Sequence, residues 1–540
     1  MQAIKRVGTS GERRIALVGR RCWVTLGLVI CVVALIGCGG SSGGSTNKSG
    51  GSTPASSSAA KSVLRIGLPY SAYQFYPNPA EISTSGGSSA LEYSIAYSSL
   101  FHLLPDGSTV GELATSGHYF NTGRGPDTGF VLTLRHGVEF SDGSPLNAAA
   151  VVDWFNFYAK QVGGFNGLFG PKPTFAAVGQ WTVRMKLSQP TANLPRILSD
   201  DGDYWGTIAS PKCVANPKLF TNATCGAGPY MLDSAATVPN SSYSYVPNPH
   251  YYDTAAVKYS GVDIKVIPLA SSTLAALQAG QLDFASVGAD TTTVASAKAA
   301  GLTVLSAPSA AYQLLLNLKD PSTKALQNVK VRQALSYALN RPALAQLIGA
   351  GGYSAASQVF PVTDVSSSTV SNSFTYDPAK AKALLAAAGY AHGLHLGIVI
   401  VTARSQDQKM YAGIAQELSA VGITTTAVNY TPAAISQNAA YLGTQFANTT
   451  PSQYLVYLKP SPIQTFGTNP TVVSLYDQGA RASNPVPAWT KLWEYVSKQA
   501  YFVTVCTVSN IWYASDRVGG LQVTEPRVGA VLIGDVHPTG

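Results

Sequence analysis

Two groups of side chains in this sequence are of types that bind metal ions. His392 and His395 are separated by two residues, but no third ligand lies near them, and they follow the glycine that ends a predicted helix. Asp200, Asp201 and Asp203 are spaced like ligands of a calcium loop, yet no glutamate follows at the position that would close it. We interpret both groups as solvated loop residues. The sequence therefore predicts no metal and no cofactor.

The folded part of the chain also lacks the short motifs that assemble catalytic groups. It contains no GxSxG, no HExxH, no GxxxxGK[ST] and no Rossmann fingerprint. These motifs place a nucleophile, a metal-bound water, a phosphate or a dinucleotide. We therefore expect a binding protein and no enzymatic activity.

Cys38 lies where an apolar segment meets a Gly/Ser-rich one. Basic residues precede the segment 22–37, which carries no charge. A basic flank, a short apolar core and small residues at its exit are typical of a secretory signal, whereas a membrane-spanning helix needs about 20 apolar residues. The exit, Leu-Ile-Gly-Cys, resembles the lipobox of bacterial lipoproteins.

That resemblance implies that residues 1–37 form a signal peptide, that Cys38 is the lipidation site, and that 38–61 form a flexible tether. The protein would then be extracytoplasmic and lipid-anchored to the outer face of the cytoplasmic membrane. Two alternatives remain, a buried cysteine in an ordinary anchor helix and a signal peptide without lipid. Arg20 and Arg21 leave the export route open between general secretion and the twin-arginine pathway.

The net charge of the chain does not indicate a nucleic-acid partner. The full sequence has 36 basic and 27 acidic residues, a net charge of +9, and removal of residues 1–37 leaves 30 and 26, a net charge of +4. A small excess spread over so long a chain, without basic runs that contain aromatic residues, is not typical of nucleic-acid binding.

Three cysteines follow Cys38. Cys213 and Cys225 lie close together in a loop that contains proline, asparagine and glycine, and in an oxidising compartment we expect them to form a disulfide. Cys506 lies in an apolar run and is predicted to be a small buried residue rather than a reactive thiol.

The apolar patterns from Val63 onward alternate between strand and helix. Strand patterns occupy 63–68 and 130–134, and helical patterns begin near residues 148, 272, 328 and 377. About 480 residues exceed one ordinary core, so at least two lobes are expected. The sequence indicates a mixed α/β protein.

Six stretches in this order resemble the extracytoplasmic solute-binding proteins, family 5, of ABC importers. This family includes binders of dipeptides, oligopeptides and nickel. The stretches are YSSLFHLLPDGSTVGELATS, FVLTLRHGVEFSDGSPLNAAAVV, GAGPYML with VPNPHYYD, STLAALQAGQLDF, LLLNLKDPSTKALQNVKVRQALSYALNRPAL and YDPAKAKALLAAAGY.

The resemblance implies a two-lobed periplasmic-binding-protein fold of type II, in the large three-subdomain class, with a hinge between the lobes. Segments 62–308 and 505–540 would form lobe I, with a subdomain at about 98–205, and 309–504 would form lobe II. The expected function is to capture a peptide-like or other small solute in the cleft and to deliver it to ABC permease subunits, as a monomer. The alternative is a surface lipoprotein that senses or buffers its ligand without transport.

The residues of the cleft are less evident. Peptide binders of this family carry an acidic residue in the second lobe for the amino end of the peptide, but no Asp or Glu occurs between Leu418 and Tyr476, which puts free-peptide recognition in doubt. Aromatic side chains suit a neutral or sugar-like solute, and a lysine suits an anionic group. Asn317 has either a backbone or a ligand role, and packing is the alternative for each aromatic residue. The candidate ligand-binding residues are Tyr70, Tyr73, Tyr204, Trp205, Asn317, Tyr454, Tyr457 and Lys459.

Overall fold

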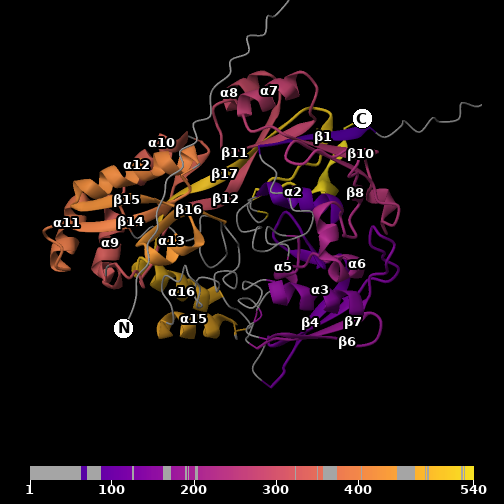
Figure 1. Cartoon of the computed structure of the whole chain (residues 1–540), viewed down its shortest axis with the longest axis horizontal. Helices are drawn as coiled ribbons and strands as arrows, with labels where there is room; N and C mark the ends of the chain where they lie inside the picture. The colour runs from indigo at the N-terminus through magenta and orange to yellow at the C-terminus, as the bar shows by residue number, and fades with distance from the viewer. Residues whose placement is uncertain are drawn as a thin grey trace, which may run out of the picture. The chain divides into compact units, whose positions relative to one another are not determined.

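The computed structural model describes most of the chain that follows the Gly/Ser-rich segment (Figure 1). Cys38 and the predicted signal and tether lie outside the described residues. None of the helices within the described residues is long and apolar enough to cross a membrane. The described residues are 62–69, 87–123, 127–161, 169, 172–188, 191, 194–200, 205–322, 324–349, 351–356, 374–402, 404–446, 469–480, 482, 486–524, 527 and 529–539.

A large mixed sheet organises these residues. The order of hydrogen-bonded neighbours is β15-β14-β16-β12-β17-β11-β1-β10-β9-β8, and β13 also pairs with β17. Its strands are β1 (Val63–Leu68), β8 (Tyr230–Leu232), β9 (Ser242–Pro247), β10 (Gly261–Val266), β11 (Phe284–Gly288), β12 (Thr303–Leu316), β13 (Tyr353–Ala355), β14 (Leu394–Ile400), β15 (Ile423–Asn429), β16 (Ala440–Phe446) and β17 (Phe502–Ala514).

Two long antiparallel strands, β12 and β17, join the two ends of this sheet. They are paired from Thr303 and Ala514 to Leu315 and Phe502. On one side β17 pairs with β11, and on the other β12 pairs with β16. Figure 1 shows both strands running between the group β14, β15 and β16 and the group β11, β1 and β10.

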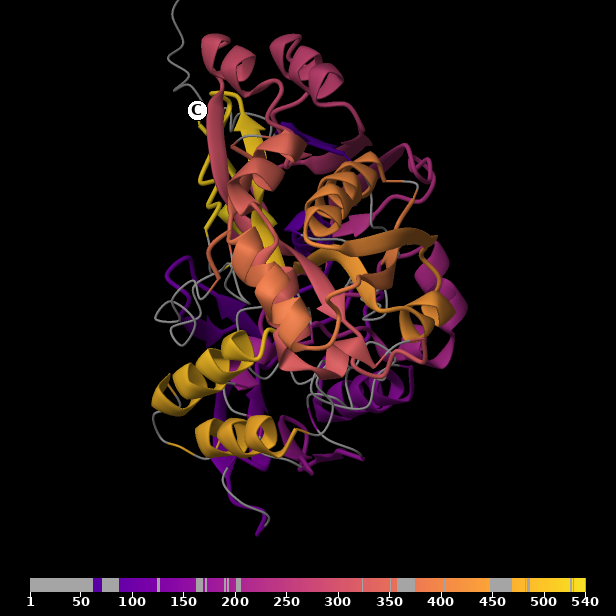
Figure 2. The same ribbon diagram turned by 90° about the vertical axis from the view of Figure 1, so that its left-hand side faces the viewer.

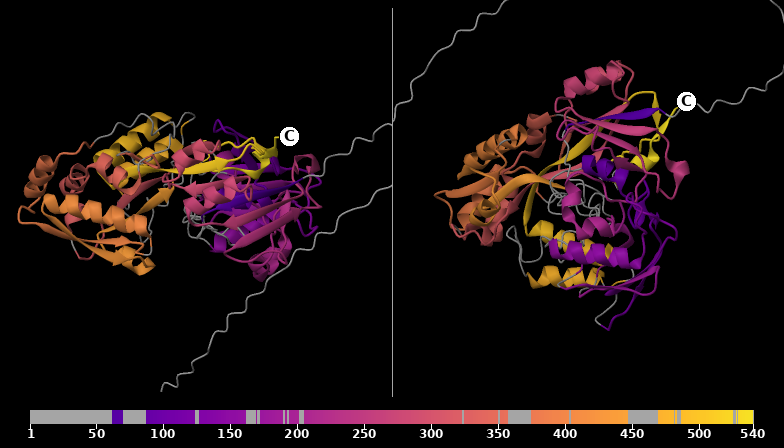
Figure 3. Two further views of the ribbon diagram at one scale, coloured as in Figure 1. Left: turned by 90° about the horizontal axis from the view of Figure 1, so that it is seen from above. Right: turned by 45° about the vertical axis from the view of Figure 1, so that its right-hand side comes forward.

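A smaller antiparallel sheet has the strand order β4-β5-β7-β6 and is formed by the N-terminal part of the described chain. Helix α3 lies along β6 and β7 (Figure 3). The short pairs β2–β3 and β18–β19 complete the strands. The bounds are β2 (Phe101–Leu103), β3 (Thr109–Gly111), β4 (Ala114–Phe120), β5 (Gly129–Leu134), β6 (Thr174–Ala177), β7 (Thr182–Lys186), β18 (Val518–Gly519) and β19 (His537–Pro538).

The helices cover both faces of the large sheet, and α12 packs across β14, β15 and β16 (Figure 2). Helices α15 and α16 pack against each other. The bounds are α2 (Gly87–Ala96), α3 (Ala148–Gln161), α5 (Leu194–Ile197), α6 (Pro211–Ala215), α7 (Ala270–Gln278), α8 (Val294–Ala299), α9 (Val329–Tyr337), α10 (Arg341–Gly349), α11 (Pro378–Ala387), α12 (Ser405–Ala420), α13 (Pro432–Gln437), α15 (Pro470–Ala480) and α16 (Val486–Lys498).

The buried apolar residues form two main cores. One gathers β1, β10, α2, α3 and the smaller sheet, and it includes Trp512 and Ala514 at the end of β17. The other gathers α9 to α12 with β14 to β16, and it includes the start of β17 up to Val508. The strand β17 therefore contributes to both cores. It links them through its own backbone and through its hydrogen bonds to β12.

The predicted strands and helices are confirmed, with small shifts at their ends. The strand predicted at 63–68 is β1, and that at 130–134 is β5. The helix predicted from residue 377 is α11, where the side chain of Asp377 accepts a hydrogen bond from the backbone N–H of Lys380 at 2.8 Å. Gly389, the predicted stop, has a φ of +89°, which favours glycine after a helix.

The cysteines after Cys38 lie in buried positions. Cys213 and Cys225 are joined in a disulfide with their Cα atoms 6.3 Å apart. Cys506 is a free and buried residue of β17, and burial raises the pKa of its thiol to about 12. The thiol is therefore protonated at neutral pH, which makes Cys506 a packing residue rather than a nucleophile.

The stretch VRQALSYALNR contains two buried arginines, Arg332 and Arg341, which hold backbone oxygens of neighbouring segments. Arg332 donates to the backbone oxygens of Leu326 and Gln327, at 2.8 and 3.1 Å. It also donates to the backbone oxygen of Gln499 at 2.8 Å. The first two oxygens belong to the 3-10 helix Ala325–Gln327 and the third to the chain just before β17, so the guanidinium fastens α9 to both segments.

Arg341 does the same at the start of α10. It donates to the backbone oxygens of Thr504, Ser336 and Phe374 at 2.8, 3.0 and 3.1 Å. Its side chain is buried, and burial lowers its pKa to about 10. The charge is thus held by carbonyl dipoles rather than by a direct carboxylate partner.

We expect Arg341→Met to lower the free energy of unfolding by about 3 kcal/mol or more, because each buried carbonyl left without a donor costs about 1–3 kcal/mol. Urea denaturation followed by circular dichroism measures this change. Lys330→Met, on the exposed side of α9, is the control and should stay within about 0.5 kcal/mol of the wild type. Equal unfolding midpoints for both variants would contradict this role of Arg341.

Candidate functional site

Most of the predicted ligand-binding residues lie outside the described residues. This holds for Tyr70, Tyr73, Tyr204, Tyr454, Tyr457 and Lys459. Trp205 and Asn317 are described.

Trp205 lies in the hydrophobic core. Only 7% of its surface is exposed, and its ring meets that of Tyr158 of α3 edge-on, with centroids 5.6 Å apart. The structure thus places Trp205 in the packing role that the sequence had left as the alternative.

Asn317 serves the backbone. Its side-chain nitrogen donates to the carbonyl oxygens of Ser436 and Asn438, at 3.2 and 3.0 Å. Its side-chain oxygen accepts from the N–H of Lys319 at 3.0 Å. The amide therefore joins the end of β12 to the turn between α13 and β16, and its hydrogen-bonding capacity is used there.

The strands β14, β15 and β16 run parallel, so their carboxyl ends lie along one edge of the sheet. From β14 the chain passes through α12 to β15 on one side, and from β15 it passes through α13 to β16 on the other side of β14. The order therefore reverses between β14 and β16. In open α/β sheets, ligands bind in the crevice outside the carboxyl ends at such a reversal.

The two connecting helices lie on opposite faces of β14. Met410 of α12 packs with Ile398 in the second main core. Ala434 and Ile435 of α13 pack with Val399. Because successive side chains of a strand point to opposite faces, Ile398 and Val399 define the two faces. The edge that carries residues 400–402 and 404 is therefore flanked by a helix on each face.

Asp407 lies on the buried side of the first turn of α12, at this edge. Only 3% of its surface is exposed, and its Oδ1 accepts a hydrogen bond from the hydroxyl of Tyr312 on β12. Its Oδ2 is buried and accepts no side-chain hydrogen bond within the described residues, whereas the backbone of Val401 donates to the carboxylate and counteracts the rise of its pKa. Burial raises the pKa of Asp407 to about 6, so the carboxylate is ionised at neutral pH.

Aromatic and polar groups lie near this carboxylate. Burial raises the pKa of Tyr441 on β16 to about 12, with a counteracting effect from the charge of Arg404 and an added one from Asp407. The ring of Tyr441 lies 5.5 Å from that of Tyr430, between centroids. The edge thus combines one buried anion, several phenols and one exposed cation.

Asp407 and Tyr312 are absent from the residues predicted from sequence. The spacing of Asp407, Met410, Ile414 and Leu418 places an acidic residue on the buried face of the helix. An acid on an apolar helical face directly after a strand is a signal that sequence reasoning could have used. The pairing with Tyr312 joins positions 95 residues apart, and no local pattern indicates it.

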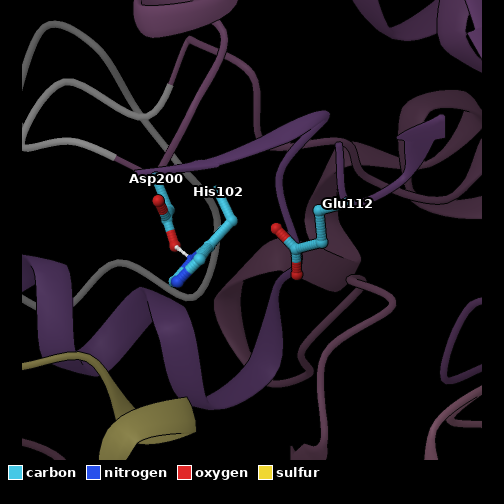
Figure 4. A group of neighbouring side chains, drawn as sticks. All are labelled: His102, Glu112 and Asp200. Carbon is cyan, nitrogen blue, oxygen red and sulfur yellow. Dashed lines mark hydrogen bonds and ion pairs between the residues drawn. The ribbon is translucent and has the colours of Figure 1, made fainter. Parts of the chain in front are cut away.

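A second group of ionisable side chains lies in the smaller sheet region (Figure 4). His102 Nδ1 and Asp200 Oδ2 are 2.6 Å apart, and Asp200 Oδ1 accepts from the N–H of Leu103 at 2.7 Å. Figure 4 shows the carboxylate of Glu112 turned toward His102, and the N–H of Ser99 donates to Glu112 at 3.1 Å.

The guanidinium of Arg527 is the fourth member of this group and lies next to His102. It donates to the backbone oxygen of Leu103 from Nε and Nη2, at 2.9 and 2.7 Å, and it pairs with Asp535. Its Nη2 lies 3.4 Å from His102 Nε2, so each ring nitrogen of His102 has a neighbour. We interpret the group as an ionic network that ties the end of the chain to β2, rather than as a metal centre.

Burial and the charge of Asp200 raise the pKa of Glu112 to about 8. Burial opposes protonation of His102, but the hydrogen bond and charge of Asp200, together with the charge of Glu112, raise the pKa of the imidazole. Both groups therefore hold protons more strongly in the folded protein than in the unfolded chain.

Solved structures that share this fold are two-lobed periplasmic binding proteins, and the chain has their α/β fold. DppA from Helicobacter pylori, in complex with the peptide STSA, has a TM-score of 0.73 at 19% identity. The structural match covers 88% of this chain and 98% of the DppA chain. MoaA of A. tumefaciens R10, in complex with mannopinic acid, has a TM-score of 0.71 at 19% identity, over 89% of this chain and 100% of its own.

The sequence model described as bacterial extracellular solute-binding proteins, family 5 Middle, matches residues 109–464, and the chain belongs to this family. It is a family of binding proteins. The glutathione-binding protein GsiB of Escherichia coli (strain K12) is 28% identical over 299 residues, which are 54% of this chain and 56% of GsiB. The chain thus spans about half the length of the curated relatives it matches.

Because the folded-state pKa of Glu112 exceeds its ordinary value, its stabilising contribution is present below about pH 4.5 and is lost as the pH rises through about 8. We expect the free energy of unfolding to decrease over this range and Glu112→Gln to make that decrease smaller. Denaturant unfolding at a series of pH values measures both slopes. Glu494→Gln, at a half-exposed site on α16, is the control. A slope unchanged by Glu112→Gln would count against the network.

Proposed function

We propose that this protein is a lipid-anchored solute-binding protein of an ABC importer, which captures a peptide-like or other small solute between two lobes and delivers it to a membrane permease. The family match over residues 109–464 carries this proposal. The reversal of strand order between β14 and β16 supports it, because it forms a place for a solute at one edge of the sheet.

In this proposal lobe I consists of 62–308 and 505–540, and lobe II of 309–504. The two hydrophobic cores support the division in outline, but residues up to Val508 of β17 pack in the core of lobe II and Trp512 packs in that of lobe I, so the crossing of β17 lies between Val508 and Trp512 rather than at 505. The strands β12 and β17 then form the two crossings between the lobes.

The hinge would lie where these two strands pass between the cores. The pairing of β12 with β17 shifts register between Pro308 and Ala310. The hydroxyl of Ser309, between them, donates to the backbone oxygen of Val508 at 3.1 Å. An extra residue in one strand bends it and interrupts its ladder, which suits a position where the backbone angle changes during domain closure.

Closure converts solute binding into a signal for the permease. A solute that contacts both lobes binds the closed state more tightly than the open one, and it shifts the population by that difference in affinity. No covalent bond is made or broken. The closed form then presents the surface that the permease subunits recognise.

The proposed solute class follows from the relatives. GsiB is named a glutathione-binding protein, and DppA binds the peptide STSA. Both solutes are short peptides, whereas MoaA binds mannopinic acid. We therefore place a peptide-like solute first and retain other small solutes within the proposal.

The purified chain without its signal and tether is expected to bind one solute molecule and to become more compact. Native mass spectrometry of the protein as isolated identifies a retained solute, and X-ray scattering measures the radius of gyration with and without it. A compound that shows no heat of binding is the control and should leave the radius unchanged. A radius that stays constant at saturation with a bound solute would contradict lobe closure.

The anchor is proposed from the residues around Cys38. Cys38→Ala is expected to abolish lipid attachment and to leave the precursor uncleaved or the protein released, while the core remains folded because the tether separates the two. Mass analysis of the amino-terminal peptide and membrane fractionation measure this result. Cys506→Ala is the control and should keep the lipid. A Cys38→Ala protein that is correctly cleaved yet stays on the membrane would refute the anchor.

A further inference from the structure

The backbone at Gly529, near the C-terminal end of the chain, packs directly on the two strands of the proposed hinge. A Cβ atom at this position would come 2.9 Å from the backbone oxygen of Ala307 on β12 and 3.1 Å from the Cβ atom of Asn510 on β17. It would also come 3.5 Å from the Cβ atom of Ser309, the residue at the register shift of β12. Gly529 has a φ of +71°, so glycine suits both the conformation and the space.

Two side chains of β17 donate to the carbonyl oxygen of Gly529. Asn510 donates from Nδ2 at 3.1 Å, and Trp512 donates from Nε1 at 2.9 Å. The hydroxyl of Ser286 on β11 donates to Asn510 Oδ1 at 2.9 Å, so the amide is held on both sides. All three side chains are buried. We call Asn510, Trp512 and the carbonyl group of Gly529 the hinge clamp.

The hinge clamp belongs to lobe I. Trp512 packs in the first main core, and so do residues 530–532, which follow Gly529. Two positions before Gly529, the guanidinium of Arg527 donates to the backbone oxygen of Leu103 on β2. The carbonyl group that receives the two donors is therefore itself fixed to lobe I on both sides along the chain.

The residues of β17 just before the hinge clamp belong to lobe II. Those up to Val508 pack in the second main core. The N–H of Ser509 donates at 2.8 Å to the backbone oxygen of Gly352, which directly precedes β13 in lobe II. The strand therefore passes from one lobe to the other between Ser509 and Asn510.

A hinge made of two strands bends wherever its backbone is not held. The hinge clamp holds β17 to lobe I from Asn510 onward, so the change in backbone angles is confined to the few residues before it and to the register shift beside Ser309. Confinement narrows the range of interlobe angles of the solute-free protein. Closure then loses less conformational freedom, which favours capture of the solute.

We infer that Asn510 is a positioning residue of the hinge, which together with Trp512 and the carbonyl group of Gly529 confines lobe closure to the residues just before it. The inference rests on the proposed function, because it takes β12 and β17 as the crossings about which the lobes close. It deepens that function by assigning the control of closure to residues close to the C-terminal end of the chain.

Double electron–electron resonance measures the distribution of distances between the lobes. Spin labels at Lys298→Cys on α8 and Lys382→Cys on α11 report on lobe I and lobe II, since both lysines are exposed. The chain from Ala60 onward, which is one compact unit, is used. After Ala60 its native cysteines are bridged or buried, so the labels attach to the new cysteines. Native mass spectrometry verifies that the labelled chain holds no solute.

Three variants are compared with the wild type. Asn510→Ala removes one donor of the hinge clamp, and Trp512→Phe removes the other while it keeps an aromatic ring. Asn248→Ala is the matched control, because Asn248 is 3% exposed and donates to the backbone oxygen of Gly228 at 2.9 Å within lobe I. We expect both clamp variants to widen the distance distribution about 1.5-fold, because about twice as many backbone positions then share the bending. The control should lose stability and keep the wild-type width.

Wild-type widths in both clamp variants would overturn the inference, and so would an equal widening by Asn248→Ala. Trp512→Phe decides the question where Asn510→Ala fails to fold. The comparison needs no solute, so its failure differs from that of the proposed function. The proposed function fails where the wild type with a solute bound keeps its solute-free distances. A wild type that closes, with clamp variants of unchanged width, rejects only the role of Asn510.

Discussion

The antiparallel pairing of β12 and β17 is the constraint on which the rest of the described structure depends. The two strands are hydrogen-bonded from Thr303 and Ala514 to Leu315 and Phe502. At about 3.3 Å per residue, the fourteen residues of β12 span about 46 Å, which is longer than an ordinary strand of five or six residues. Such a length lets one pair of strands serve two hydrophobic cores. Because these strands lie some 200 residues apart in sequence, their pairing also closes a long loop of the chain.

Buried arginines secure the elements attached to that pair. Arg332 and Arg341 donate to backbone oxygens near or on β17 from the starts of two successive helices. Arg527 does the same for β2 through the oxygen of Leu103. In each case a planar cation with five donors donates to backbone carbonyl oxygens from its buried position. The arrangement explains why arginine, rather than lysine, occupies positions where the charge itself has no function in binding.

The two cores and the arginine contacts hold the scaffold together. The reversal of strand order lies apart from them, at the edge of β14, β15 and β16. The buried carboxylate of Asp407 lies at that edge, where the hydroxyl of Tyr312 and the backbone of Val401 donate to it. Trp205 and Asn317 belong to the scaffold, since they serve packing and the backbone.

The sequence by itself determined the class of the fold and the local elements, because hydrophobic periodicity, caps and turn residues act over a few positions. The helix that begins after Asp377, the strand from Val63 and the burial of Cys506 follow from such local patterns. Only the tertiary structure decided which polar residues meet. Tyr312 and Asp407 are 95 positions apart, and His102 and Arg527 are 425 apart. No local signal encodes such pairs, since they result from strand order and register, which the chain reaches only by burying both cores together.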